Sequence, residues 1–282
     1  MNPYYDKLIN FDGAQGLDRL IRKWAVLSSN LKTLPVNGPI LIPDLFVVSH
    51  SNTMLSRMID TLSSYLIAQK NLLDFNGDIP CFEFMLNYCP PGAGFKELER
   101  LIDGISDCAG YRNEFRGIVH IKLDYWLGHQ EEHHFIDLLD YLSENTFKWL
   151  IILSVSTKNE DKASAMESVL SMFLRIERVT LHRASTTTYV GEIEDLLGDY
   201  GFSLDDSAKE LLSESIDVLR GNRYFDSVGA VDLFGSDIIY DLYSREHMSP
   251  GVLSAQDLQT FSKDSNYIKR TLQKVKKRIG FA

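Results

Sequence analysis

The first two-thirds of the chain alternates between short apolar runs and longer amphipathic segments. Five of the runs are rich in β-branched and aromatic residues and are bounded by Gly, Pro, Asn or Asp, a pattern typical of strands. One of them is almost continuously apolar, as expected for a strand that is covered on both faces. The predicted strands are Asp44–Ser49, Ile79–Leu86, Gly117–Leu123, Trp149–Ser156 and Ile176–Arg183.

Between these runs, apolar residues recur every third or fourth position, which predicts helices with one buried face. Strands that alternate with helices indicate βαβ crossovers and therefore an α/β fold with a five-stranded, mainly parallel sheet flanked by helices. The predicted helices are Met54–Leu72, Phe95–Cys108, Glu131–Glu144 and Ala163–Phe173.

The pattern changes near Ala184, where the small polar segment Ala184–Thr188 predicts a linker. Beyond it the periodicity predicts only helices, with Gly201 as a C-cap and a turn at Pro250-Gly251. We therefore expect two domains, an α/β core over residues 1–185 and a smaller all-helical domain over residues 186–282. The predicted helices of the second domain are Tyr189–Tyr200, Ser207–Arg220, Phe225–Tyr243 and Ala255–Arg278, the last with a possible break.

Short matches accompany this order of elements. Phe11–Ile21 is similar to the segment that precedes the core of AAA+ modules, and Leu45–Val48 followed by Met54–Leu66 is similar to their first strand and helix. Gly221–Tyr224 falls where their helical lid carries its sensor-2 region. The chain thus resembles an AAA+ ATPase module of the P-loop NTPase superfamily. The resemblance implies a helical lid domain, and subunits that meet with the lid of one against the core of the next.

A working P-loop has the pattern G-x-x-x-x-G-K-[ST], in which glycines let backbone N–H groups surround the phosphates and the Lys neutralises charge. Aligned on the first helix, Ser51 stands at the second Gly, Asn52 at the Lys and Thr53 at the Mg²⁺-binding hydroxyl. Side chains with a Cβ resist the positive φ of a phosphate nest. The pattern predicts a degenerate Walker A loop. His50 is either a substitute phosphate contact or an ordinary loop histidine.

The third strand should end in the Walker B pair, an Asp for Mg²⁺ and a Glu that polarises water. The sequence allows two registers: Asp124 is the metal carboxylate and Tyr125 replaces the Glu, or Lys122 stands at the Asp position. Both registers lose the catalytic Glu. Asp124 also has a simpler interpretation, as a carboxylate that caps the end of a strand.

Five further positions are candidates by the same resemblance. Ser156 or Thr157 would be the sensor-1 residue, and Arg175 or Arg178 would be an arginine finger toward a neighbouring subunit. Each also fits an ordinary surface position. Arg223 is the nearest candidate for the sensor-2 arginine, although it precedes the helix that should carry it. The vestigial nucleotide site is therefore expected to comprise Ser51, Asn52, Thr53, Asp124 and Arg223.

Other chemistries find little support. His129–His134 places two histidines four residues apart, but Gln130 stands where a zincin needs Glu, so we expect a charged helix start and no metal site. Pro90–Gly94 lacks the Lys of a phosphate loop. The three cysteines, Cys81, Cys89 and Cys108, form no CxxC pair, which favours reduced thiols.

The net charge of −10 argues against nonspecific binding of nucleic acid by the whole surface. A basic segment over Lys269–Arg278 leaves a nucleic-acid module as an alternative that we do not favour. No apolar run is long enough for a transmembrane helix, and the acidic, aromatic start lacks the features of a signal peptide. We therefore expect a cytoplasmic protein without membrane contact.

These observations predict an AAA+-like protein that keeps the fold and has lost the chemistry, a non-hydrolysing binding or assembly component with a protein partner or self-association. No catalytic residue is assigned and no cofactor is expected, although ATP and Mg²⁺ stay possible ligands. The alternative function is a divergent active ATPase that remodels a protein or nucleic acid through Thr53, Asp124 and an arginine from Arg175 or Arg178.

Overall fold

The structure is a computed structural model that describes residues 2–33, 42–50, 54–69, 72, 81–85, 100, 117–144, 149–221, 228–246 and 249–278. The chain folds into two compact units, the first reaching His182 and the second beginning at Arg183. Among the described residues no helix is long and apolar enough to cross a membrane.

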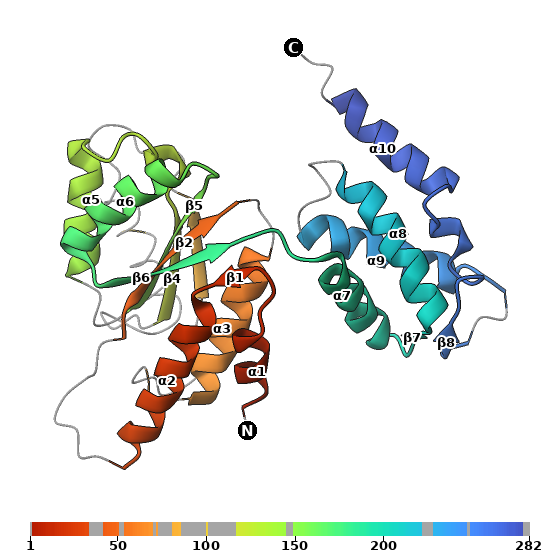
Figure 1. The fold of residues 1–282 in the computed structure, drawn as a ribbon, viewed down its shortest axis with the longest axis horizontal. Coiled ribbons are helices and arrows are strands. Elements are labelled where there is room, and N and C mark those ends of the chain that lie inside the picture. The colour runs from red at the N-terminus through yellow and green to blue at the C-terminus, as the bar shows by residue number, and fades with distance from the viewer. Residues whose placement is uncertain are drawn as a thin grey trace. The chain divides into compact units, whose positions relative to one another are not determined.

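The first unit is built on a six-stranded sheet (Figure 1). Its strand order is β1-β6-β2-β5-β4-β3, and every neighbouring pair is parallel except β1 with β6. The five parallel strands confirm the predicted α/β sheet, and the short antiparallel β1 was not predicted. The strands are β1 Ala14–Gln15, β2 Asp44–Ser49, β3 Cys81–Met85, β4 Gly117–Lys122, β5 Trp149–Ser156 and β6 Ile176–Leu181.

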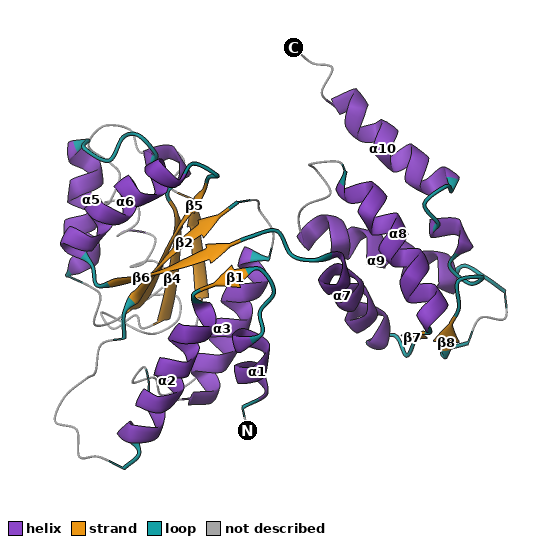
Figure 2. Ribbon diagram, viewed as in Figure 1, coloured by secondary structure: helices purple, strands orange, loops and turns teal. Residues whose placement is uncertain are grey.

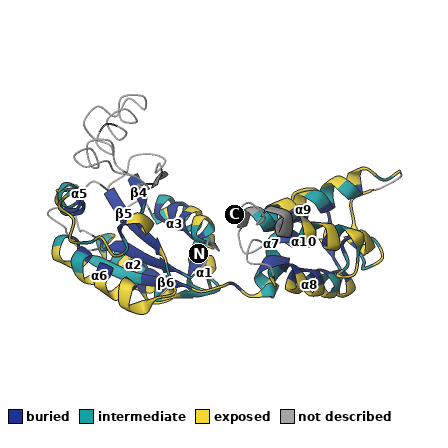
Figure 3. Ribbon diagram, turned by 90° about the horizontal axis from the view of Figure 1, so that it is seen from above, coloured by how far each residue is buried: buried dark blue, intermediate teal, exposed yellow. Residues whose placement is uncertain are grey.

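Helices cover both faces of this sheet (Figure 1). One face carries α1 (Pro3–Ile9), α2 (Leu17–Leu31) and α3 (Leu55–Gln69), and the other carries α5 (His133–Ser143) and α6 (Glu160–Phe173). The central strands are buried between the two layers, as Figure 3 shows for β4 and β5. This three-layer arrangement explains why the fourth predicted strand is apolar on both sides.

The period of two along each strand assigns its side chains to the layers. In β5, Ile151 and Leu153 pack in the core beneath α5 and α6, whereas Leu150 and Ile152 pack beneath α2 and α3. The strand order reverses direction at β2, which has the later strands β6 and β5 on its two sides. In parallel α/β sheets, ligands bind at the carboxyl ends of the strands beside such a switch point.

The second unit is mainly helical (Figure 2). Its helices are α7 (Thr186–Gly198), α8 (Asp206–Arg220), α9 (Val228–Tyr243) and α10 (Asn266–Arg278). Helices α7 and α9 approach closely, because a Cβ on Gly235 would lie 2.7 Å from Leu196 Cδ2. The predicted all-helical character was nevertheless wrong in one detail: β7 (Ser203–Leu204) pairs in parallel with β8 (Val252–Leu253).

Two predicted boundaries in this unit also need correction. Residues 255–265 form turns and the 3-10 helix η2 (Gln259–Phe261), so the last helix begins at Asn266 and not at Ala255, and the possible break lies before it. The Asp257 carboxylate accepts hydrogen bonds from the backbone N–H and the hydroxyl of Ser254, which stabilises a turn there. The linker is shorter than predicted, because Ser185 caps α7 by accepting from Thr188 N.

The N-terminal segment carries elements that the hydrophobic pattern did not predict, namely α1, β1 and α2. Gly16 joins β1 to α2 with φ of 92°, and a Cβ at this position would lie 3.0 Å from the carbonyl oxygen of Arg178. The close approach of β6 therefore requires glycine here. The predicted helix Phe95–Cys108 lies outside the described residues, apart from Arg100.

Candidate nucleotide site

The predicted loop residues Ser51, Asn52 and Thr53 lie outside the described residues, so their geometry stays a prediction. Their flanks are described. Ser49 ends β2 and is buried, and Met54 has φ of 57°, a left-handed conformation that is rare for a residue with a side chain. Helix α3 begins at Leu55, after Met54. In a P-loop the Lys and hydroxyl residues open the helix, so this helix begins later than that motif requires.

Asp124, the candidate Walker B carboxylate, lies just past the end of β4, in the 3-10 helix η1 (Asp124–Trp126). Its Oδ1 accepts a hydrogen bond from the backbone N–H of Ser156 at 2.6 Å. Lys122 stands at the Asp position in the other register. It is the last residue of β4 and pairs with Ser154 on β5. The carboxylate of Asp124 thus joins the ends of β4 and β5.

Tyr125 stands where the first register would place the catalytic Glu. Its side chain is 40% exposed, and its ring stacks on that of His129 with centroids 5.6 Å apart. A phenol does not replace the carboxylate that orients water in active P-loop NTPases. The position offers an aromatic surface instead.

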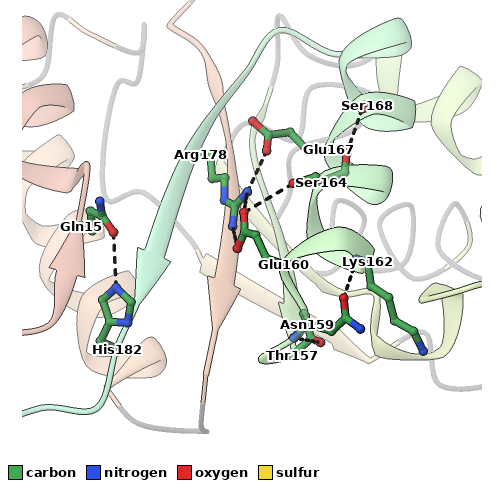
Figure 4. A network of polar contacts seen from close by, with 10 residues as sticks. All are labelled: Gln15, Thr157, Asn159, Glu160, Lys162, Ser164, Glu167, Ser168, Arg178 and His182. Carbon is green, nitrogen blue, oxygen red and sulfur yellow. Dashed lines mark hydrogen bonds and ion pairs between the residues drawn. The ribbon is translucent and has the colours of Figure 1, made fainter.

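The two sensor-1 candidates end β5 and begin the next turn. Ser156 is exposed, and its backbone N–H is the donor to Asp124. The Thr157 hydroxyl accepts from the backbone N–H of Asn159, and Asn159 in turn caps α6 by accepting from Lys162 N (Figure 4). The Thr157 side chain therefore organises the start of α6.

Arg178, a candidate arginine finger, lies on β6 and points toward α6 (Figure 4). Its guanidinium contacts Glu160 at 2.8 Å and Glu167 at 3.1 Å, and its side chain is 19% exposed. Hydrogen bonding to Arg178 lowers the pKa of Glu160, as expected for a stabilised carboxylate. Two carboxylates of the same chain therefore neutralise this arginine. Arg175, the other candidate, is exposed at the start of β6.

Sequence reasoning missed a buried polar pair between β4 and β5. The side chain of His120 is fully buried, and its Nε2 lies 2.8 Å from Ser154 Oγ. The only sequence signal is a histidine in the middle of an otherwise apolar strand. The pair satisfies two polar groups inside the sheet, close to the edge where the candidate site lies.

A second pair that the sequence did not reveal joins the ends of β2 and β6. His50 Nδ1 lies 3.1 Å from His182 Nδ1, and His182 Nε2 lies 3.3 Å from Gln15 Oε1 on β1 (Figure 4 shows the Gln15 contact). Desolvation, followed by the charge of His182, lowers the pKa of His50. The Nδ1 atom of His50 therefore contacts the imidazole of His182 at the edge of the sheet.

The candidate sensor-2 residue Arg223 lies outside the described residues. The nearby Arg220, at the end of α8, is described and has a structural role. Its guanidinium donates to the hydroxyl of Thr186 and the carbonyl of Ala184, and it lies 4.9 Å from the centre of the Tyr189 ring. Arg220 thus fixes the start of α7 against the end of α8.

The histidine-rich segment before α5 forms local contacts. His129 Nδ1 lies 2.8 Å from Glu132 Oε1, while His133 and His134 both face Asp137. In the described part of the chain, no group of three or more His, Cys, Asp or Glu residues is arranged to hold a metal ion.

Comparisons with known proteins agree with this architecture. No protein-family profile and no curated protein matches the sequence. Among solved structures, C. elegans PCH-2 is similar with a TM-score of 0.54 at 11% identity, over 96% of this chain and 74% of that one. A point variant of Thermotoga maritima RuvB is similar with a TM-score of 0.52 at 11% identity, over 98% and 80%.

A DNA clamp loader delta protein from Bacillus subtilis matches with a TM-score of 0.36 at 14% identity, over 86% of this chain. This chain spans 61% of the length of that protein. At such identities a structural similarity shows the fold alone. The topology of the sheet, the helical unit that follows it and the two similarities above 0.5 together give this chain the fold of an AAA+ P-loop module.

Proposed function

We propose that this chain is an AAA+-like binding or assembly component that does not hydrolyse nucleotide. The observation that carries the proposal is the first strand–helix junction, where a loop without glycine or lysine is followed by Met54 at φ of 57° and a helix that begins only at Leu55. Phosphate binding at a helix N-terminus needs free backbone N–H groups and a nearby cation, and this loop supplies no lysine.

The other catalytic positions support the same proposal. Asp124 already accepts a backbone N–H of the neighbouring strand, and Tyr125 replaces the Glu that would polarise water. Arg178 is held by two carboxylates of its own chain, so presenting it to a neighbouring subunit would first break both ion pairs. The candidate residues therefore have contacts that stabilise the fold.

Exposed apolar side chains on α9 support a role in binding another protein. Leu233 is 63% exposed and Tyr240 is 76% exposed, and they lie seven residues apart, so both fall on one side of the helix. Exposed apolar residues that gather on one face are typical of protein contacts. Partners are expected to be proteins, or further copies of this chain.

The test is an equilibrium titration of the chain with fluorescent ATP and ADP analogues, with and without Mg²⁺, together with phosphate release at saturating ATP. We expect no Mg²⁺-dependent binding in the micromolar range and no turnover above a buffer blank. Sedimentation of the same samples measures self-association. The association state should be the same with and without nucleotide.

Micromolar affinity that requires Mg²⁺ would contradict the proposal and favour a divergent ATPase. In that case Thr53→Ala and Asp124→Ala should each abolish turnover, because both would then hold the metal and phosphates. The matched control is Thr61→Ala, a hydroxyl on α3 that donates to the carbonyl of Arg57 and lies outside the loop. If all three variants behaved alike, turnover would come from a contaminant.

A further inference from the structure

The histidine pair at the ends of β2 and β6 is held by rigid backbone on both sides. His50 N donates to the carbonyl of Leu181 at 3.0 Å, and His182 N donates to the carbonyl of Gly13 at 2.8 Å. Both residues therefore extend the pairing of the sheet, and their side chains meet from neighbouring strands with ring centroids 4.6 Å apart at 80°. A geometry set by paired strands is pre-organised for binding.

The proton positions follow from the third member, Gln15. With the Gln15 amide oriented so that Oε1 faces the ring, this oxygen accepts and Nε2 of His182 carries the proton. In the neutral imidazole, Nδ1 of His182 is then an acceptor whose lone pair faces His50. A histidine that donates one ring N–H to an oxygen and offers the other nitrogen is the arrangement found in metal sites.

The separation of the two Nδ1 atoms fits a shared metal ion. Transition-metal–imidazole bonds are about 2.0–2.1 Å long, so two nitrogens 3.1 Å apart subtend an angle of roughly 100° at a common ion. This angle lies between those of square-planar or octahedral sites and tetrahedral sites. Two changes are needed for both lone pairs to face the ion. The His50 proton moves from Nδ1 to Nε2 through solvent, and both rings turn about χ2, because the lone pair of His182 now lies along the line between the two nitrogens.

The charges around the pair are mixed. Glu160 acts on His50 and favours positive charge, whereas Lys158, Arg178 and His182 oppose it. Glu160 is one of the two carboxylates that already offset the charge of Arg178, and His182 would itself be a ligand, so of these cations Lys158 is the one that still opposes a bound ion. Neither imidazole is deeply buried, and His182 is exposed, so water can reach the ion and complete its coordination.

We propose that His50 and His182 form a two-imidazole site for a divalent transition-metal ion such as Zn²⁺ or Ni²⁺, with Gln15 as the outer partner that fixes the ring of His182. Within the described residues no third His, Cys, Asp or Glu completes the set, so the remaining positions are open to water or to an anionic group. Imidazole ligands suit Zn²⁺, Ni²⁺ and Cu²⁺ and disfavour Mg²⁺. The site is therefore chemically distinct from an ATP–Mg²⁺ site.

The test uses the full chain without an affinity tag, stripped of metal with a chelator and titrated with Zn²⁺ by calorimetry. The wild type should show one saturable site per chain that His50→Ala and His182→Ala each remove. Gln15→Leu should keep the site but weaken it about tenfold, because the ring loses its orienting acceptor. His133→Ala is the matched control, since its imidazole is exposed and faces Asp137.

Cobalt absorption separates imidazole from cysteine ligation, because thiolate-bound Co²⁺ adds a charge-transfer band that imidazole does not. Thermal melting followed by circular dichroism verifies that each variant is folded before titration. A wild type that binds Zn²⁺ no better than the His50→Ala, His182→Ala double variant would overturn the proposal. So would equal losses in His133→Ala, or a cobalt spectrum with thiolate ligands only.

Discussion

The carboxylate of Asp124 accepts a hydrogen bond from the backbone N–H of Ser156, with 2.6 Å between Oδ1 and the nitrogen. The bond bridges the carboxyl ends of β4 and β5, at the residue that one of the two predicted registers makes the Walker B carboxylate. A carboxylate that accepts a backbone donor is stabilised in place, and binding a metal through the same oxygen would require this bond to lengthen or break.

Replacing Asp124 with Ala should therefore lower the free energy of unfolding of the first unit by about 1 kcal/mol, the usual net value of one hydrogen bond. Asp124→Asn keeps an acceptor oxygen and should lose less. Urea denaturation followed by tryptophan fluorescence reports this unit alone, because Trp24, Trp126 and Trp149 all lie in it. The loss should be the same with and without MgATP, and a loss that grows with MgATP would assign Asp124 to metal binding.

The sheet was predictable because its signal is local. Four of the five parallel strands begin at the predicted residue, and β2 and β5 also end at it, since each run is apolar and bounded by turn-forming residues. The strands β1, β7 and β8 have only two residues each, too few for any pattern. They form because distant segments meet, as when Ala14 pairs with Leu181.

For the candidate site, the sequence predicted the missing glycine and lysine of the loop but not the contacts between distant residues. The absence of glycine and lysine between Ser49 and Met54 can be read from the sequence alone. By contrast, His50 and His182 are separated by 132 positions, and nothing near either residue indicates the other. Arg178 was assigned to a surface or a neighbouring subunit for the same reason: its partner Glu160 is 18 residues away, across the turn from α6 to β6.

Arg178→Gln should destabilise the first unit, because Glu160 and Glu167 would lose their shared cation while remaining close together. Arg175→Gln, an exposed arginine three residues earlier, is the matched control and should have a smaller effect. The measurement is the thermal midpoint followed by tryptophan fluorescence, at low and at high salt. Salt screens exposed ion pairs, so the difference between the two variants should shrink as salt is added.

An arginine finger would behave differently in a mixing experiment. If Arg178 acted on a neighbouring subunit, adding the Arg178→Gln chain to the wild type would change nucleotide turnover and leave the thermal midpoint of each chain unaffected. A normal midpoint for Arg178→Gln combined with altered turnover in the mixture would contradict the structural role assigned to this arginine.

Two glycines in the helical unit should respond to alanine with opposite signs. Gly201 follows α7 with φ of 81°, and a Cβ there would lie 3.0 Å from Pro250 Cβ. Gly201→Ala should therefore cost about 1–2 kcal/mol through backbone strain and contact with Pro250. Gly191 lies inside α7 with open space around its Cβ position, so Gly191→Ala should stabilise by up to about 1 kcal/mol.

Hydrogen exchange of the amides of α7 and α8 measures this effect, because the second unit contains no tryptophan. Gly201→Ala should speed exchange across both helices and Gly191→Ala should slow it. Equal protection in the two variants would mean that the left-handed turn after α7 is not needed to hold β7 beside β8.

Asp44 at the start of β2 should make the stability of the first unit depend on pH. Its carboxyl is 3% exposed and accepts a hydrogen bond from Ile151 N at 2.8 Å, and burial raises its pKa to about 7 from 3.8. Between these two values the folded state binds more protons than the unfolded state. The contribution of Asp44 to stability is therefore complete at low pH, falls as pH rises from 3.8 toward about 7, and is constant above that range.

Asp44→Asn removes this titration while keeping an oxygen that can accept from Ile151 N. Any fixed cost of the buried amide is the same at every pH, and all other titrating groups are shared with the wild type, so both cancel when the two proteins are compared across pH. The free energy of unfolding of Asp44→Asn minus that of the wild type should rise by about 2–3 kcal/mol between about pH 5 and pH 8. Urea denaturation followed by tryptophan fluorescence at several pH values measures this difference. A constant difference would mean that the Asp44 carboxyl ionises as readily in the folded state as in the unfolded chain, and a difference that falls with pH would mean that it ionises more readily in the folded state. Either result would show that burial at the start of β2 does not hold the proton.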